Sequence, residues 1–354
     1  MTPPDAAVPL PWIASALDEI LGSTRAHAWL LHGPQGVGQF ELALQVAQGW
    51  LCEADPPVRR ACGVCVSCRL VHAHTHPDLL VLVPEALQVE LGWGGGDTES
   101  ASGSARGAKA KPSKDIKVEA VREAVAFAQL SSARARAKVV VLHPAERMNA
   151  IAANSLLKTL EEPAGLARFV LSCAAPEALL PTVRSRCQSR AIALPPTAQA
   201  LEWLAQHGVV QPPGLLAGAG GQPQLALEWS RDGIDAALWA ALPGAVQRGH
   251  ASAVAGWPVP RVLDALQKLC HDAACVACGA APRYFASADV PRGASVAALL
   301  AWMGELQRIA RHAEHPWNVA LLAESLVLQG QRALHVPGPA PGPRAGARGR
   351  GAPG

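Results

Sequence analysis

The stretch HGPQGVGQFELA, residues 32–43, has the glycine spacing of a phosphate-binding loop. In loops of the G-x-x-x-x-G-K-[ST] type, backbone N–H groups and a helix start hold the phosphates, a lysine reaches the outer phosphates and a hydroxyl binds Mg²⁺. Three glycines take the loop positions: Gly33, Gly36 and Gly38. Gln39 stands where the lysine belongs and Phe40 where the hydroxyl belongs. Since neither can supply the charge or the metal ligand, the sequence predicts a degenerate nucleotide site.

A second stretch, VVVLHPAE at residues 139–146, allows an independent check. In nucleotide hydrolases with a phosphate-binding loop, a second buried strand ends with an Asp that binds Mg²⁺, usually followed by a Glu that activates water. His143 and Pro144 occupy those places, and Glu146 comes two positions too late. The two defects agree and predict that this chain does not hydrolyse ATP efficiently. An accidental glycine spacing, without any nucleotide history, is the alternative.

A cysteine cluster points to metal binding. Its four members are Cys52, Cys62, Cys65 and Cys68. Four thiolates complete a closed tetrahedral Zn²⁺ site, and such a site has no open position for water, so its expected role is structural. Nearby histidines are alternative ligands: His72, His74 and His76. Free cysteines without metal are the other interpretation, although exposed thiols in a loop are prone to oxidation.

The chain has nine cysteines in total, and the other five call for a different interpretation. Cys270, Cys275 and Cys278 include a C-x-x-C step but fall in an alanine-rich helical region, so we expect core residues rather than a second metal site. Cys173 and Cys187 are expected to be buried. The start of the sequence shows neither a secretory signal nor a transit peptide, which favours a cytoplasmic protein and metal ligation over disulfides.

Bulk composition narrows the class of protein. The chain has 354 residues, half of them hydrophobic and 17% charged, with a formal net charge of +3. This length predicts two or three compact units, and no apolar run approaches the roughly 18 residues of a membrane span. The near-neutral charge argues against strong DNA binding by the isolated protein.

Alternating hydrophobic patterns place these residues on a sheet domain. Buried strands are expected within residues 27–33, 76–84, 138–144 and 167–174, and helices at 12–21, 41–51, 116–130 and 149–162. On the third helix, the residues expected to face the core are Val118, Val121, Val125 and Leu130. Strands that alternate with helices predict an α/β fold, a parallel sheet covered on both faces.

Other segments predict the domain organisation. Residues 92–114 are rich in Gly, Ser, Ala and Lys and predict a flexible insertion. After residue 196 the pattern is helical, with Pro/Gly breaks near 212–223 and 256–260, and residues 337–354 predict a disordered tail. The expected domains are 1–194, with the nucleotide site, the cysteine module 52–68 and the insertion, then helical domains 195–235 and 236–336.

Two further segments carry a family resemblance. With NSLLKTLEEP at 154–163 and LLPTVRSRC at 179–187, the chain resembles the clamp-loader branch of the AAA+ family, most closely its delta prime family from bacteria. The cysteine cluster, HPDLLVL, and WNVALLAESLVLQG at 317–330 add to the resemblance. It implies an AAA+ (RecA-like) module with a structural zinc module, a small helical lid and an all-α collar.

The resemblance also implies partners. A chain of this family is a non-hydrolysing subunit of a DNA polymerase holoenzyme, a nucleotidyltransferase complex. It joins ATPase subunits of the gamma/tau type and a delta-type subunit in a heteropentamer. This complex loads the sliding clamp onto primed DNA for replication. The same resemblance implies no bound ATP in this chain and no membrane contact.

Single residues gain expected roles from the resemblance. In the segment SRC, residues 185–187, the family's arginine reaches the ATP held by a neighbouring subunit, and Arg186 takes that place. A planar, permanently charged fork suits this role as an arginine finger. Arg184 is expected to be an ordinary surface charge, and an Arg186 paired with a surface carboxylate is the alternative. In GGQPQLALEW, residues 220–229, Leu225 takes the place of a nucleotide-sensing arginine.

Two other functions remain open at this point. One is an AAA+ ATPase with a deviant phosphate loop, which predicts measurable ATP binding by the purified chain. The other is a zinc-dependent DNA-binding module, which predicts tight, salt-sensitive DNA affinity.

Overall fold

The chain divides into two compact units, Met1–Gln199 and Ala200–Gly354. The structure is a computed structural model that describes residues 10–23, 26–54, 60–89, 91–93, 112–312 and 315–335. Most of the expected insertion at 92–114 and all of the expected tail at 337–354 therefore lie outside the described residues. Among the described residues, no helix has both the length and the apolar character needed to cross a membrane.

The first unit is built on a parallel sheet. Its strands are β1 (Ala28–His32), β2 (Leu79–Leu82), β3 (Lys138–Leu142), β4 (Ala167–Cys173) and β5 (Gln188–Ala191). They are ordered β2-β3-β4-β1-β5, and each neighbouring pair is parallel. All five residues of β3 are buried, because helices cover both faces of a parallel sheet. The expected α/β class is thus confirmed.

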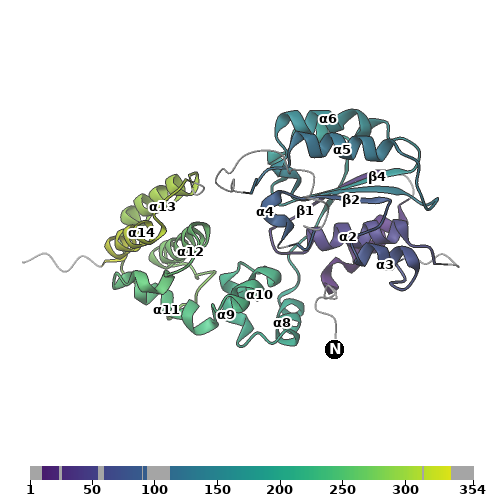
Figure 1. Cartoon of the computed structure of the whole chain (residues 1–354). Helices are drawn as coiled ribbons and strands as arrows, with labels where there is room; N and C mark the ends of the chain where they lie inside the picture. The colour runs from purple at the N-terminus through teal and green to yellow at the C-terminus, as the bar shows by residue number, and fades with distance from the viewer. Residues whose placement is uncertain are drawn as a thin grey trace, which may run out of the picture. The chain divides into compact units, whose positions relative to one another are not determined.

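Helices lie on both faces of this sheet. Their bounds are α1 (Ala14–Gly22), α2 (Gln39–Leu51), α3 (Val66–His72), α4 (Glu85–Gln88), α5 (Val118–Gln129), α6 (Ala150–Glu161) and α7 (Pro181–Arg184). Figure 1 shows α5 and α6 on one face and α2 and α3 on the other. Short 3-10 helices are η1 (Pro11–Ile13), η3 (Ala145–Arg147) and η4 (Pro176–Ala178).

Capping and periodicity explain where the helices of the first unit begin and which face they bury. The Asn149 side chain accepts a hydrogen bond from Ala152 N at 2.8 Å and thereby caps the start of α6. On α5, Val121 is fully buried and Val125 packs against the core, as expected. Leu130 is 62% exposed, so its expected core position is wrong. It follows the last helical residue in extended backbone, out of phase with the buried face.

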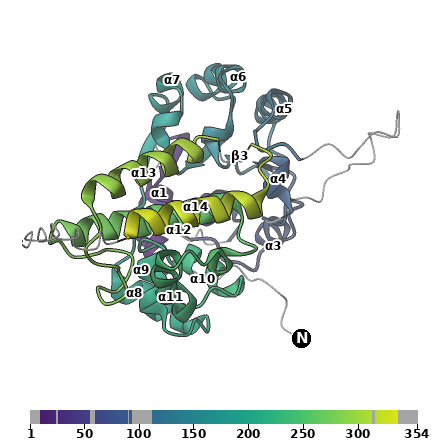
Figure 2. The same cartoon turned by 90° about the vertical axis from the view of Figure 1, so that its left-hand side faces the viewer.

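The second unit is helical. It contains most of α8 (Thr197–Gln206), followed by α9 (Pro212–Gly218), α10 (Pro223–Arg231), α11 (Ala236–Gln247), η5 (Ala251–Val254), α12 (Val259–Ala277), α13 (Val296–Ala310) and α14 (Val319–Leu334). In Figure 2, α12, α13 and α14 pack side by side. The expected break at 212–223 is wrong in part, because Pro212 and Pro223 occupy first turns of helices, where a missing N–H is tolerated.

Candidate functional site

The glycine loop joins β1 to α2, and two of its glycines have left-handed backbone conformations. Gly36 and Gly38 have positive φ angles of 73° and 94°, and Gly38 is the residue that precedes α2. A left-handed conformation strains residues with a side chain, so these positions favour glycine. Trp12 Nε1 donates a hydrogen bond to Val37 O at 2.8 Å, so the N-terminal 3-10 helix is tied to the loop.

Gln39 is turned into its own loop. Its side chain is 6% exposed, and Nε2 donates hydrogen bonds to Gly33 O at 2.6 Å and to Pro34 O at 2.7 Å. Both amide protons of Gln39 are therefore used by loop carbonyls. The amide is neutral, so this position contributes no positive charge that could attract a triphosphate.

Phe40 and His143, which stand at the expected hydroxyl position and at the expected strand-end position, pack against each other. Their ring centroids are 4.7 Å apart, and Phe40 is 7% exposed. His143 Nδ1 lies 2.9 Å from Ser172 Oγ at the end of β4. Burial lowers the pKa of His143 to about 4, so the ring is neutral at pH 7. Phe40 on α2 and His143 just after β3 thus form an aromatic pair, which their separate sequence motifs did not predict.

The other two residues considered at the end of β3 are Glu146 and Pro144. Glu146 Oε1 accepts hydrogen bonds from Ala174 N at 2.8 Å and Ala175 N at 3.4 Å, just after β4. Pro144, which takes the place of the water-activating residue, has a ring without an ionisable group. Oε1 of Glu146 is therefore engaged in holding the loop after β4, whereas its Oε2 is buried without a hydrogen-bond partner among the described residues.

Arg186 lies on the turn after α7 and is paired within the chain. Its Nη2 is 3.0 Å from Glu161 Oε2 at the end of α6, and Nη1 donates to Thr182 O at 3.0 Å. The side chain of Glu161 is 59% exposed. Exposed pairs of this kind contribute about 0–1 kcal/mol, so the contact can be exchanged at low cost. Arg184, expected to be a surface charge, is exposed.

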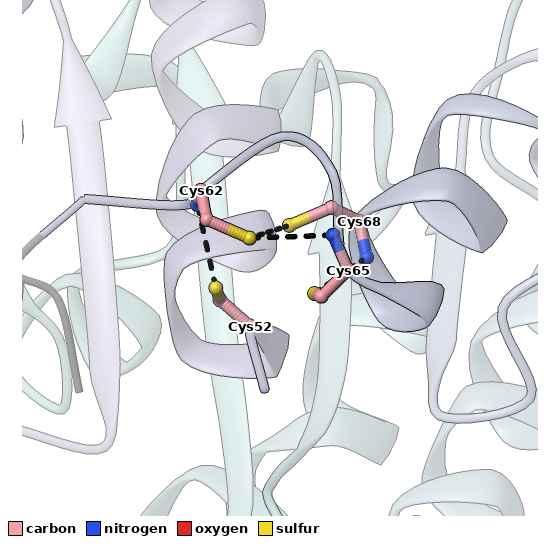
Figure 3. Close-up of side chains that lie close together, drawn as sticks. All are labelled: Cys52, Cys62, Cys65 and Cys68. Atoms are coloured by element: carbon pink, nitrogen blue, oxygen red, sulfur yellow. Dashed lines mark hydrogen bonds between the residues drawn. The ribbon is translucent and has the colours of Figure 1, made fainter. Parts of the chain in front are cut away.

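The four cysteines of the cluster converge between α2 and α3 (Figure 3). Their sulfur atoms all lie within 4.8 Å of one another. Cys52 follows α2, Cys65 precedes α3, and Cys68 lies within α3. A tetrahedral site with metal–sulfur bonds of about 2.3 Å needs sulfurs about 3.8 Å apart. The Cys62–Cys68 sulfur distance of 4.0 Å meets this requirement.

Backbone N–H groups prepare the cluster for a cation. Cys65 N donates to Cys62 Sγ at 3.3 Å, and Cys68 N donates to Cys65 Sγ at 3.4 Å. Hydrogen bonds from the backbone of Val64 and Cys65 lower the pKa of Cys62 to about 6, whereas burial raises the pKa of Cys68. Donors that point at sulfur stabilise the thiolate form, which is the form that binds metal.

The three nearby histidines are not part of this cluster in the described structure. His72 Nε2 is 2.9 Å from Gln48 Nε2, and His74 stacks on Trp93 with centroids 3.9 Å apart. His76 is buried, with Nε2 2.7 Å from Ser67 Oγ, while its Nδ1 accepts from Asp78 N at 3.0 Å. The cysteine-only donor set is the one that the geometry supports.

A charged network beside the cluster was missed from the sequence. Asp78 is fully buried and accepts hydrogen bonds from Ala133 N at 2.8 Å, Arg134 N at 3.0 Å and Lys138 Nζ at 3.1 Å. Arg134 also makes a two-pronged pair with Glu53, at 2.6 and 2.9 Å. Burial alone would raise the pKa of Asp78, but these hydrogen bonds hold it below its usual range. The HPDLLVL segment therefore joins the cysteine module to the sheet, and its Asp ahead of an apolar strand was the available signal.

The remaining positions singled out in the sequence, five cysteines and Leu225, lie outside the cysteine cluster. Cys173, Cys187 and Cys270 are buried, as expected. Cys275 is partly exposed and Cys278 is exposed, so the expectation of core residues is wrong for Cys278, which lies just beyond the end of α12. In the other unit's α10, Leu225 is partly buried and carries no charge.

Comparison of the sequence with known proteins shows the family of this chain. A family model described as "DNA polymerase III, delta subunit" matches residues 13–196, more than half of the chain. The chain is 38% identical over 229 residues to the DNA polymerase III subunit delta' of Pseudomonas aeruginosa, covering 63% of this chain and 62% of that protein.

Two more relatives show the range of the similarity. Identity to the DNA polymerase III subunit delta' of Escherichia coli is 31% over 280 residues, covering 73% of this chain and 76% of that protein. Identity to the DNA polymerase III subunit tau of Salmonella typhimurium is 30% over 161 residues, or 46% of this chain and 21% of that protein. The resemblance drawn from the sequence motifs is thereby confirmed, and the chain belongs to the DNA polymerase III delta subunit family, with delta' subunits among its relatives.

Proposed function

We propose that this protein is a non-hydrolysing delta' subunit of the DNA polymerase III clamp loader. The observation that carries the proposal is the set of side chains at the glycine loop and at the end of β3. Gln39 bonds the carbonyls of its own loop, and Phe40 packs on the neutral His143 where a metal ligand would be needed. Hydrolysis requires positive charge on the outer phosphates and a bound Mg²⁺, and these residue types supply neither.

Arg186 is the residue that we propose to act on a partner. An arginine finger stabilises the charge that develops on the transferred phosphoryl group of a neighbouring ATPase subunit. The exposed Glu161 holds the guanidinium at the surface, so the neighbour's phosphates can replace a weak contact. The partners are ATPase subunits of the gamma/tau type and a delta-type subunit in a heteropentamer. Through this cytoplasmic complex, the chain takes part in loading the sliding clamp onto primed DNA.

Reconstitution with the ATPase subunits tests this role. We expect Arg186→Ala to lower DNA-stimulated ATP turnover at the adjacent site by about a thousandfold or more, in line with other arginine fingers. Arg184→Ala is the matched control, because it removes an exposed charge two residues away and should leave turnover unchanged. Equal turnover in the wild-type and Arg186→Ala complexes would show that the trans-acting role is wrong.

The degenerate cleft has its own test. We expect equilibrium titration of the purified chain with ATP to show no binding at about millimolar concentration, because the loop lacks its charge clamp. ATP turnover that persists after stringent purification would favour an ATPase with a deviant loop. A zinc-dependent DNA-binding module would instead show tight, salt-sensitive DNA affinity in the isolated protein.

We propose a structural zinc ion at Cys52, Cys62, Cys65 and Cys68. The cysteine-only donor set, the sulfur spacing and the N–H donors support this assignment. We expect metal analysis to find about one equivalent of zinc per chain, and chelation to destabilise the module. Less than about half an equivalent in carefully prepared protein would contradict the assignment. We also propose that residues 195–235 form a helical lid domain and that residues 236–336 form a helical collar domain.

A further inference from the structure

The end of α12 carries two cysteines that the proposed function does not use. Cys275 lies in the last turn of the helix and Cys278 is the residue that follows it. Cys278 N donates to Cys275 O at 3.1 Å, and Ala280 N donates to the same carbonyl at 2.8 Å. Gly279 has a positive φ of 77°, which lets the chain leave the helix in this tight turn. The cap therefore fixes the two cysteine backbones relative to each other.

The Cα spacing of this pair lies in the range of disulfides, and closing the bridge requires the two Cβ atoms to turn toward each other at the helix end. A helix with a radius of about 2.3 Å and a rise of about 1.5 Å per residue places Cα atoms three residues apart at about 5 Å. Disulfides bridge Cα atoms about 4.4–6.8 Å apart. Cys275 is partly exposed and Cys278 is exposed, so neither residue is buried in the core. Cys270 on the same helix is buried, and its Sγ donates to Leu299 O at 3.2 Å.

A histidine and a carboxylate accompany the pair. Cys275 Sγ lies 3.8 Å from His271 Nε2 and 3.9 Å from Nδ1, one helical turn away. His271 Nδ1 is 2.9 Å from Asp272 Oδ1, which leaves Nε2 as the nitrogen that can accept the thiol proton. Asp272 is fully buried and accepts hydrogen bonds from Arg283 N, Tyr284 N and Phe285 N. The carboxylate beside His271 is thus fixed by the following loop.

We propose that Cys275 and Cys278 form a reversible disulfide, with Cys275 as the thiol that an alkyl or hydrogen peroxide oxidises first. The Cys275 thiol passes its proton to His271, and the sulfur attacks the peroxide, giving a sulfenic acid and releasing an alcohol or water. The Cys278 thiol then attacks this sulfenic acid and water leaves. In sum, two thiols and one peroxide give one disulfide, one water and one alcohol or second water.

The position of the pair sets how the thiols behave. The carbonyl end of a helix carries partial negative charge, unlike the positive helix start that stabilises the reduced form of strongly oxidising dithiols. This end of the helix therefore disfavours the thiolates, so the reaction of Cys275 depends on His271 as the acceptor of its proton.

Peptide mass spectrometry of the full chain tests the proposal directly. Trypsin cuts after Lys268 and Arg283 and releases residues 269–283, which contain Cys270, Cys275 and Cys278 and no other cysteine. The native protein is treated with hydrogen peroxide, unfolded, alkylated and digested. We expect a peptide that has lost two hydrogens and carries one alkyl group, on Cys270. Treatment with a dithiol reductant before alkylation should return the peptide with three alkyl groups.

Variants separate the roles of the residues. Cys275→Ser and Cys278→Ser should each abolish the two-hydrogen loss, whereas Cys270→Ser should keep it. In Cys278→Ser, a sulfenic-acid trap should label Cys275 faster than it labels Cys278 in Cys275→Ser. His271→Gln should slow disulfide formation about three- to tenfold, below the effect of a fully aligned general base. Three alkyl groups after oxidation, a bridge to Cys270, or equal labelling of the two variants would overturn the proposal.

Discussion

The buried His143 makes the stability of the sheet unit depend on pH. Its pKa is lowered to about 4 by burial, whereas an exposed histidine in the unfolded chain has a pKa of about 6.5. Between about pH 6.5 and pH 4, His143 is therefore mostly neutral in the folded protein and mostly protonated in the unfolded chain. The stability that the neutral ring contributes is complete above pH 6.5 and is lost as the pH falls from there through 4.

The size of the effect follows from the two pKa values. Linkage gives a loss of about 2 kcal/mol at pH 5 and about 0.2 kcal/mol at pH 7, relative to a residue that does not titrate. We expect His143→Gln to remove this term. The replacement also loses the ring contact with Phe40, but that cost does not change with pH.

The assay compares the wild-type chain with His143→Gln in urea at pH 7 and pH 5. Hydrogen exchange of the β3 and β4 amides reads the unfolding of the sheet unit alone. Other groups that titrate, such as Asp78, contribute equally to both proteins and cancel in the difference. The gap between the two free energies of unfolding should shrink by about 1–2 kcal/mol between pH 7 and pH 5. A gap that stays constant would refute the burial argument for His143.

Two more substitutions probe how the cleft and the cysteine module are supported. Asp78→Ala should lower the free energy of unfolding by about 3–5 kcal/mol, because it leaves the Lys138 ammonium buried without its carboxylate partner. Urea denaturation measures this loss. Glu85 is exposed, so Glu85→Ala is a control that should change the free energy of unfolding by less than about 1 kcal/mol. Gly33→Ala should cost about 1–3 kcal/mol, because its Cβ would overlap Ile192 O beyond β5. A thermal melt identical to that of the wild type would contradict this close approach.

Much of the sheet domain could be predicted because its buried strands are long apolar runs. The run at 138–142 needs no partner information to be recognised as a central strand. β5 was missed for a physical reason: Gln188–Ala191 lies at the edge of the sheet with mostly exposed, polar residues, so no hydrophobic pattern marks it. Its pairing with β1 is a property of the assembled sheet.

In the candidate site, too, some features could be predicted from the sequence and others arise only in the folded sheet. Residue types at spaced positions were enough to predict that four cysteines could converge, and they suggested a loop without a lysine or a hydroxyl at its end. They could not predict that Phe40 would pack on His143, since these residues are far apart in sequence and meet only after β1 and β3 join one sheet. The Arg134–Glu53 pair was hidden for the same reason, because it joins a loop to the end of a helix.

The Phe40–His143 pair also limits how the cleft can change through evolution. Replacing Phe40 by threonine would restore a hydroxyl but remove a buried ring, at a cost of about 3–5 kcal/mol, while His143 would still provide no carboxylate. Changing His143 to aspartate first would place a carboxylate against a phenyl ring. Each single reversion is thus expected to be a stability defect without catalytic return. Under the proposed function, regaining hydrolysis would need changes at Phe40 and His143 together and a lysine in place of Gln39 as well.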